Sequence, residues 1–215
     1  MKQELKKIIK TIYGVIYRLR IKKNISIISN DCCAGCIYSD VGFKFLSPTI
    51  NLYINGSDFL KFVNNIEEYF NSELIEYKKH EKDYPIGIIK NTVLGDVKID
   101  FIHYKNFEEA KNKWNERKQR VDFSNILILY HVNDENIEYI NEILKLNFNK
   151  KIIAYKTQKI VKHNDIIILR RLKKFEPAKI LQTNKLLGRR YLEEINYIEL
   201  FNSVNGGCKK WRIIK

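Results

Sequence analysis

The sequence has 215 residues and a formal net charge of +14, and 45% of its residues are hydrophobic. This composition excludes an intrinsically disordered chain and supplies a folded core for one large domain or two small ones. The positive charge favours anionic partners, although Lys, Ile and Asn are abundant together, as in proteins from AT-rich genomes.

The basic N-terminal segment is not followed by a continuous apolar block or a small-residue cleavage site, so we expect no signal peptide. No stretch reaches the roughly 20 apolar residues of a membrane-spanning helix. We therefore expect a cytoplasmic protein. In that compartment Cys32, Cys33, Cys36 and Cys208 should be reduced thiols.

Residues 2–20 are predicted to form an amphipathic helix. Its apolar residues recur at three- and four-residue spacing, at Leu5, Ile8, Ile9, Ile12, Ile16 and Leu19. Lysine and arginine in the same stretch suit a peripheral contact with an anionic membrane. The commoner alternative is that the apolar face packs on the helix's own domain, and we expect that packing.

The first half of the chain alternates strands and helices. A buried strand is predicted over residues 24–30, followed by a turn into a short helix at 32–42. A strand at 48–55 precedes a helix at 56–72, for which Ser57 or Asp58 is the expected N-cap. Residues 85–90 and 97–104 are predicted to form an antiparallel hairpin, and a helix capped by Asn106 follows at 106–121.

The second half changes pattern. A strand at 125–132, a helix at 133–147 and a strand at 150–156 predict a βαβ unit with parallel strands. A further strand is expected at 165–172 and a closing helix at 189–204. The sequence therefore predicts an α/β protein of two small α/β subdomains. The first, residues 1–121, has a mixed sheet with a hairpin, and the second, residues 122–215, is a βαβ-type layer.

Three cysteines in "NDCCAGCIY", residues 30–38, raise the question of a metal or redox site. Cys33 and Cys36 form a C-x-x-C pair, which is half of a zinc knuckle. The histidines, His80, His103, His131 and His163, are scattered along the sequence, and a thioredoxin-like context is missing. We expect no metal and no cofactor.

A nucleophile is the better chemical interpretation of this stretch. Cys32 follows a strand and precedes a helix, where exposed backbone N–H groups lower the pKa of a thiol. His103 also ends a predicted strand and is the expected base. The sequence therefore predicts Cys32 and His103 as a catalytic pair. The alternative is that Cys32 is a small buried hydrophobic residue.

A ligand pocket without covalent chemistry is a further alternative. Ligands of open α/β sheets bind beyond the carboxyl ends of the strands. Ser29, Asn30, Asp31 and Gly35 lie at one such end, and His103 and Tyr104 at another. A basic helix carrying Arg117, Lys118 and Arg120 is expected to border the crevice and to hold an anionic small molecule such as a sugar phosphate. Neither G-x-G-x-x-G nor a P-loop pattern occurs.

Nucleic acid is a less favoured partner. Tyr and Phe are plentiful, at 13 and 11 residues, but most fall at periodic, core-facing positions. The sequence shows no helix-turn-helix, RRM or KH pattern. The oligomeric state is not predicted.

Four stretches occur in a recognisable order: "ISNDCCAGCIY" (28–38), "SPT" (47–49), "YPIG" (84–87) and "HYKNFEEAKNKWNER" (103–117). Together they resemble a bacterial family of unknown function whose members are often described as exopolysaccharide or capsule biosynthesis proteins. The resemblance is close over residues 25–121 and looser beyond. The sequence departs from the family pattern at Cys33, Ala34 and Cys36, where the family has Trp, Gly and a non-cysteine residue.

The resemblance implies a role in making a surface polysaccharide rather than a particular reaction. Its matching positions include Cys32 and His103, and they bring Thr49 into the predicted binding set of Ser29, Asn30, Asp31, Gly35, Thr49, Tyr104 and Arg117. We expect a transferase acting on a sugar-nucleotide or sugar-lipid substrate. The alternatives are a non-enzymatic basic module that docks on a membrane-associated assembly and, third, a nucleic-acid-binding protein.

Overall fold

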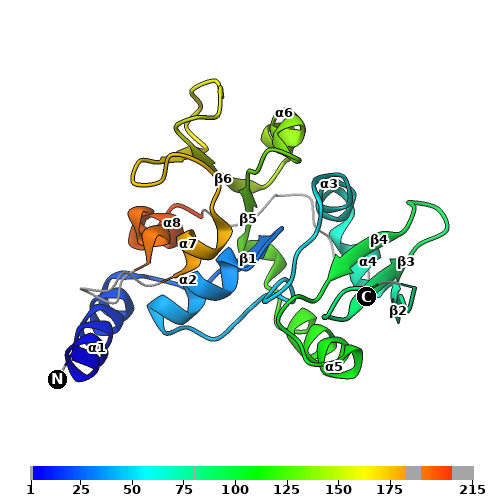
Figure 1. Ribbon diagram of the computed structural model, residues 1–215, viewed down its shortest axis with the longest axis horizontal. Coiled ribbons are helices and arrows are strands. Elements are labelled where there is room, and N and C mark those ends of the chain that lie inside the picture. The colour runs from blue at the N-terminus through cyan, green and yellow to red at the C-terminus, as the bar shows by residue number, and fades with distance from the viewer. Residues whose placement is uncertain (1, 80, 183–189, 205–215) are drawn as a thin grey trace.

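The structure, a computed structural model, describes residues 2–79, 81–182 and 190–204. Within these residues the strands form a four-stranded sheet in the order β1-β5-β6-β7 and a three-stranded sheet in the order β2-β3-β4. Helices surround the first sheet, and the second lies with α5 at the opposite side of the molecule from α1 (Figure 1). The predicted α/β class is confirmed.

The four-stranded sheet is parallel throughout. Its strands are β1 (Ser26–Ser29), β5 (Ile126–His131), β6 (Asn149–Tyr155) and β7 (Ile166–Leu169). Every residue of β1 and β5 is buried, which confirms the prediction of buried strands at these two places. The pairing of β5 with β6 across α6 (Ile140–Lys145) confirms the predicted βαβ unit.

Successive residues of β5 point to opposite faces of this sheet, and each face has its own apolar core. Ile128 and Tyr130 belong to a cluster that also contains residues of the antiparallel sheet. Leu127 and Leu129 belong to a second cluster under the helices α2 (Cys33–Val41) and α8 (Tyr197–Asn202). The parallel sheet therefore separates two cores, and its strand ends are the natural place for a site.

The three-stranded sheet is antiparallel, with strands β2 (Glu73–Glu76), β3 (Ile86–Lys90) and β4 (Val97–Asp100). The pairing of β3 with β4 confirms the predicted hairpin. A mixed sheet is expected for the first half, whereas β1 joins the parallel sheet and leaves the hairpin in a separate sheet. The expected strand at 48–55 makes only one isolated bridge, between Tyr53 and Asp100.

The parallel sheet takes strands from both sides of the boundary expected between residues 121 and 122. Ser26 of β1 pairs with Ile126 of β5. The division into subdomains stays a prediction, but the sheet shows that residues before and after the boundary share a core.

Helix starts follow the capping side chains. Asn106 caps α5 (Phe107–Lys118) by accepting a hydrogen bond from the Glu109 N–H at 2.8 Å, which confirms the prediction. The cap of α3 (Gly56–Asn64) is Asn55, so the expectation of Ser57 or Asp58 is wrong. The helix predicted at 56–72 is interrupted at Asn65, whose φ of −140° is not helical, and continues as α4 (Ile66–Asn71).

The C-terminal part of the described chain contains the short helix α7 (Pro177–Leu181) and α8. Short 3-10 turns occur at 123–125, 137–139 and 191–194. Helix α8 covers only part of the closing helix predicted at 189–204. Cys208 lies outside the described residues. Among the helices within the described ranges, none is both long and apolar enough to cross a lipid bilayer.

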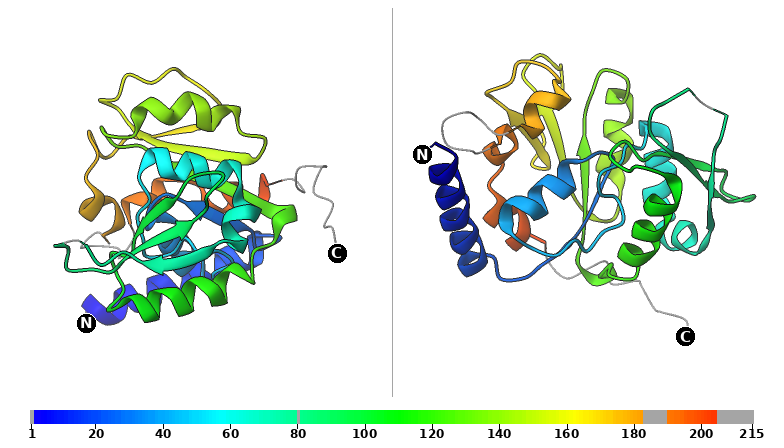
Figure 2. Two further views of the ribbon diagram at one scale, coloured as in Figure 1. Left: turned by 90° about the vertical axis from the view of Figure 1, so that its right-hand side faces the viewer. Right: turned by 60° about the horizontal axis from the view of Figure 1, so that its bottom comes forward.

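Helix α1 (Lys2–Arg20) forms as predicted, but its orientation differs from the expectation. Its contacts with the rest of the chain include Tyr13 and Tyr17, and the Tyr17 ring lies 5.7 Å from that of Tyr197. Ile21, just beyond the end of the helix, is buried. The apolar residues Leu5, Ile8, Ile12, Ile16 and Leu19 are exposed, so the prediction that this face packs on its own domain is wrong. Figure 2 shows α1 along the edge of the molecule.

Candidate functional site

A cavity of about 710 Å³ opens beyond the carboxyl ends of β1 and β5. These two strands are neighbours in the parallel sheet, so the residues that follow them meet at one edge. The loop after β4 and the segment near α7 complete the walls. The lining residues are Asn30, Asp31, Cys32, Tyr53, Ile102, His103, His131, Asn133, Asp134, Glu135, Phe175, Leu181 and Gln182.

Asn30 joins the ends of the two strands. Its Oδ1 accepts a hydrogen bond from the His131 N–H at 2.8 Å, and its Nδ2 donates to the His131 carbonyl at 3.0 Å. The same carbonyl accepts a bond from Asn136 Nδ2 at 3.0 Å. The Asn30 side chain therefore continues the link between β1 and β5 beyond the last backbone pair of the two strands. This link holds Asp31 opposite His131.

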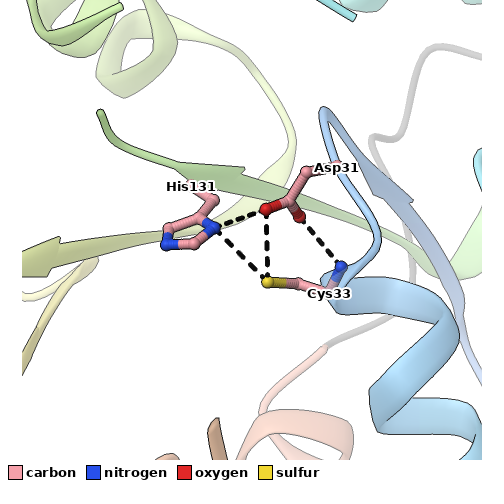
Figure 3. A group of neighbouring side chains, drawn as sticks. All are labelled: Asp31, Cys33 and His131. Carbon is pink, nitrogen blue, oxygen red and sulfur yellow. Dashed lines mark hydrogen bonds and ion pairs between the residues drawn. The ribbon is translucent and has the colours of Figure 1, made fainter. Parts of the chain in front are cut away.

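Asp31, Cys33 and His131 form a compact cluster at this edge (Figure 3). His131 Nδ1 is hydrogen bonded to Asp31 Oδ2, and Cys33 Sγ lies 3.5 Å from each of these two atoms. The other carboxylate oxygen of Asp31 accepts bonds from the Cys33 N–H at 2.9 Å and from Ser29 Oγ at 3.3 Å. The first turn of α2 thus holds the carboxylate against the imidazole.

The far side of the His131 ring is also engaged. Its Nε2 forms a hydrogen bond of 2.6 Å with Tyr155 Oη, and the Phe175 ring meets it edge-on with centroids 5.0 Å apart. Both ring nitrogens therefore have partners, and the ring orientation is fixed. His131 and Tyr155 are almost fully buried.

Burial and charge set the ionisation of the cluster. Burial by itself would raise the pKa of Asp31, but the charge and hydrogen bond of His131 and the bonds from Cys33 outweigh it, and the pKa is lowered. Burial raises the pKa of both the Cys32 and the Cys33 thiols, and the neighbouring Asp31 carboxylate raises them further. The carboxylate is therefore the ionised group, and in the metal-free cluster the two thiols are protonated.

Cys32 and His103, the predicted catalytic pair, both line the cavity. The Cys32 thiol is 4% exposed and donates to the Leu52 carbonyl at 3.7 Å. Its raised pKa works against formation of a thiolate nucleophile. His103 is exposed on the loop after β4, where it can reach a ligand. Their role as a pair stays a prediction.

Ser29, Gly35 and Thr49 are not among the residues that line the cavity. They lie behind these residues and contact other parts of the chain. The Ser29 N–H donates to Thr49 Oγ1 at 2.9 Å, which ties β1 to the 47–49 segment. A Cβ on Gly35 would lie 3.1 Å from Ile50 Cγ2, so this glycine allows α2 to approach that segment closely. Gly35 therefore accommodates the protein's own chain at this point.

Tyr104 and Arg117 are bonded to each other beneath the surface. Arg117 Nη1 donates to Tyr104 Oη at 2.7 Å, Tyr104 donates to the Ile50 carbonyl at 2.8 Å, and the guanidinium lies over the Phe45 ring. Lys118 Nζ donates to the Phe70 carbonyl, and Arg120 pairs with Glu116. These basic residues are absent from the described lining of the cavity, where they were expected.

His131 is the main residue that sequence reasoning missed. The prediction that the histidines are scattered and unpaired is wrong for His131, which pairs with Asp31. A signal was available, because His131 ends a buried apolar strand just as Asn30 and Asp31 follow one. The adjacency of β1 and β5 turns these two strand ends into one site. Tyr53, Asn133, Glu135 and Phe175 also line the cavity and were missed, because the sequence does not show which segments lie side by side.

Asp31, Cys33 and His131 are also the described residues that could share a metal ion, because their donor atoms lie within 4.8 Å of one another. The partners of Cys33 in this set are Asp31 and His131. Cys36, its partner in the C-x-x-C pair, is not part of the set.

The sequence profile of a family described as "Domain of unknown function (DUF1919)" matches residues 4–202. The chain is also similar to a protein of Haemophilus influenzae named "Uncharacterized protein", with 27% identity over 198 residues that cover 87% of this chain and 88% of the relative. All the residues that line the cavity fall within the matched range. Neither description names a reaction or a ligand.

Proposed function

Because the chain belongs to the family "Domain of unknown function (DUF1919)", we propose its function from the cavity itself: it binds a carbohydrate, and the protein is a transferase that acts on a sugar during surface polysaccharide synthesis. The observation that carries this proposal is the chemistry of the lining residues. The resemblance to exopolysaccharide biosynthesis proteins agrees with a role in surface polysaccharide synthesis, and the transfer reaction is part of the proposal.

The cavity walls combine hydrogen-bonding groups with aromatic rings. Asp31, Asp134 and Glu135 supply carboxylate acceptors, and Asn133 and Gln182 supply amides that both donate and accept. Tyr53 and Phe175 supply ring surfaces. A sugar presents hydroxyl groups around its edge and C–H groups on its faces, so it can satisfy both kinds of wall. The cavity volume of about 710 Å³ lies within the usual range of small-molecule sites.

The charge of the walls favours sugar hydroxyls over phosphate. The described lining contains three carboxylates and no lysine or arginine. Arg117, the expected phosphate ligand, is held by Tyr104 and Phe45. If the substrate is a sugar nucleotide, its sugar occupies this cavity and its diphosphate lies outside the acidic walls.

His103 is the side chain we assign to proton transfer. An imidazole accepts the proton of an acceptor hydroxyl as that oxygen bonds to the anomeric carbon of the donor sugar. The bond from that carbon to the diphosphate breaks, the nucleoside diphosphate leaves with the electron pair, and the proton passes from the imidazole to solvent. Asp31, kept ionised by His131, accepts a hydrogen bond from a sugar hydroxyl. Cys32 forms part of the wall between them and positions the ligand.

Saturation-transfer NMR tests the binding step. The probes are glucose, galactose and N-acetylglucosamine, each free and as the UDP-sugar, with inorganic phosphate as competitor. We expect transfer to sugar-ring protons that phosphate does not displace. Glu135→Gln should weaken the signal, and Glu142→Gln, an exposed carboxylate on α6, should leave it unchanged. Displacement by phosphate, or no transfer to any probe, would contradict the proposal.

The rate of UDP release from the bound UDP-sugar tests the reaction. His103→Gln should lower that rate by about a hundredfold and leave sugar binding intact, because general acid–base catalysis contributes at least that factor. His163→Gln is the matched control, since His163 is exposed and lies outside the cavity lining. Equal rates for the two variants would remove His103 from the reaction.

A second candidate function, peripheral docking on an anionic membrane, is favoured by α1. Six large apolar side chains face solvent on this helix, with exposed fractions of 54% for Leu5, 55% for Ile8, 53% for Ile12, 49% for Val15, 37% for Ile16 and 81% for Leu19. Their three- and four-residue spacing places them on one face. The opposite face carries Tyr13 and Tyr17, which pack on the protein.

The positive charge of α1 indicates which partner covers its exposed apolar face. Residues 2–20 contain six lysines and arginines and one acidic residue, Glu4, in a chain of net charge +14. A second copy of the chain would bring the same positive charge, whereas anionic lipid headgroups neutralise it. We therefore infer that α1 lies in the headgroup region of a membrane.

Vesicle co-sedimentation tests this inference. We expect binding to vesicles with 30% phosphatidylglycerol, weaker binding to phosphatidylcholine alone, and loss of the difference at high salt. Binding to neither, with a concentration-dependent dimer in solution, would show that the apolar face joins two copies instead.

A further inference from the structure

We propose that Asp31, Cys33 and His131 bind a divalent transition-metal ion and that their ligand chemistry selects zinc. They offer one carboxylate oxygen, one sulfur and one imidazole nitrogen, with all donor atoms within 4.8 Å of one another. Zinc is bound in proteins by these three atom types, whereas magnesium and calcium prefer oxygen ligands. This site goes beyond the carbohydrate proposal and does not depend on it.

The spacing of the donor atoms fits such an ion. Around a tetrahedral zinc ion, bonds of about 2.0–2.3 Å place a sulfur ligand about 3.5 Å from a nitrogen or oxygen ligand. Cys33 Sγ lies 3.5 Å from Asp31 Oδ2 and 3.5 Å from His131 Nδ1. The hydrogen bond between Asp31 and His131 closes the triangle (Figure 3). An ion at its centre displaces the proton shared by Asp31 and His131 and the proton of the Cys33 thiol, and both protons pass to solvent. It also requires the Asp31 and His131 atoms to move slightly apart.

The atoms behind the three ligands are already fixed. His131 Nε2 is bonded to Tyr155 Oη at 2.6 Å, which directs the Nδ1 lone pair to the cluster when Nε2 carries the proton. The second oxygen of Asp31 accepts from the Cys33 N–H and from Ser29 Oγ. Metal-binding histidines and carboxylates are typically oriented by such outer partners.

The charge of the set is balanced once an ion binds. Binding displaces the proton of the Cys33 thiol, so that a carboxylate and a thiolate carry two negative charges in a region where His131 and Cys33 are almost fully buried. A divalent cation neutralises these two charges. Asp31 and His131 line the cavity, so three protein ligands would leave a position for water or substrate on that side.

Titration of the full-length, chelator-treated protein with Co²⁺ tests the proposal. Tetrahedral cobalt gives strong visible bands, and a thiolate ligand adds a near-ultraviolet charge-transfer band. We expect one ion per chain with both signals. Cys33→Ala should lose the charge-transfer band and weaken binding by more than about a hundredfold, since loss of an outer-shell partner alone costs 10–100-fold. Tyr155→Phe should show that smaller loss.

Three cysteine variants are the matched controls. Cys32→Ser, Cys36→Ser and Cys208→Ser should each keep one ion and the charge-transfer band. Absence of cobalt binding in the wild type, or a Cys33→Ala protein that binds as well as the wild type, overturns the proposal. So does loss of binding in Cys36→Ser, because the C-x-x-C pair would then be the site. Circular dichroism verifies that each variant is folded, and the cobalt signal does not require a sugar ligand.

Discussion

In most proteins polar side chains lie outside and apolar side chains inside. The carboxyl edge of the parallel sheet buries polar side chains, whereas helix α1 exposes apolar ones. At the edge, polar side chains are sealed inside: Asn30, His131 and Asn136 are each 1% exposed. On α1, apolar side chains lie outside, up to 81% exposed at Leu19. Isolated cases of either kind are ordinary, but a cluster of buried polar groups or an exposed apolar face is informative.

The difference between the two regions is instructive. The buried polar groups at the edge are satisfied by one another through a continuous set of hydrogen bonds, so the edge is specified by the fold. The apolar face of α1 is presented to solvent and contributes little to the fold, so its residues are explained by something outside the chain. Substitutions at the edge should therefore cost stability, and substitutions on α1 should cost binding.

The largest expected effect is at Asn30. Asn30→Ala leaves the buried His131 N–H without its acceptor and removes one of the two donors to the His131 carbonyl. We expect the free energy of unfolding to fall by about 3 kcal/mol in urea denaturation. Asn64→Ala, which removes an exposed bond to the Leu60 carbonyl, should change it by less than about 0.5 kcal/mol. Equal losses would end the distinction between the edge and the surface.

The next effect is on α1 and appears in binding rather than stability. Replacing Ile8 and Ile12 together by Glu removes two half-exposed apolar side chains from the proposed membrane contact. Partitioning onto anionic vesicles should weaken by about 2 kcal/mol, roughly thirtyfold, with an unchanged unfolding midpoint. The control is Thr11→Glu, which adds one negative charge without removing apolar surface. A lower midpoint for the double variant would show that this face packs within the protein.

The smallest effect is expected at Gly35, between the edge and the core. A Cβ there meets Ile50 at 3.1 Å, and the crowding is offset by the better helix propensity of alanine. Gly35→Ala should therefore change the free energy of unfolding by no more than about 1 kcal/mol. It should leave the sugar-probe signals unchanged, because Gly35 does not line the cavity. Loss of those signals in a stable protein would restore the ligand contact predicted for Gly35.

Local features of the fold could be predicted from the sequence, because they depend on neighbouring residues. The Asn106 cap, the β3–β4 hairpin and the βαβ unit are of this kind. The order of strands was not predictable, because periodicity does not say which strands are neighbours. That order places His131 beside Asp31, so the sequence identified the residues that follow β1 but not those at the end of β5. Likewise, the spacing on α1 reveals an apolar face but not the direction in which it points.

The pairing of β1 with β5 also has a consequence for a chain that is being synthesised. Ser29 leaves the ribosome about 100 residues before its partner Leu129, with the whole antiparallel sheet encoded between them. At about 5–20 residues per second, the wait is roughly 5–20 s. During it, the apolar strand "SIIS" has both edges open, which exposes it to pairing with other nascent chains. A ribosome that stalls before residue 126 would therefore leave β1 without its partner strand for the length of the pause.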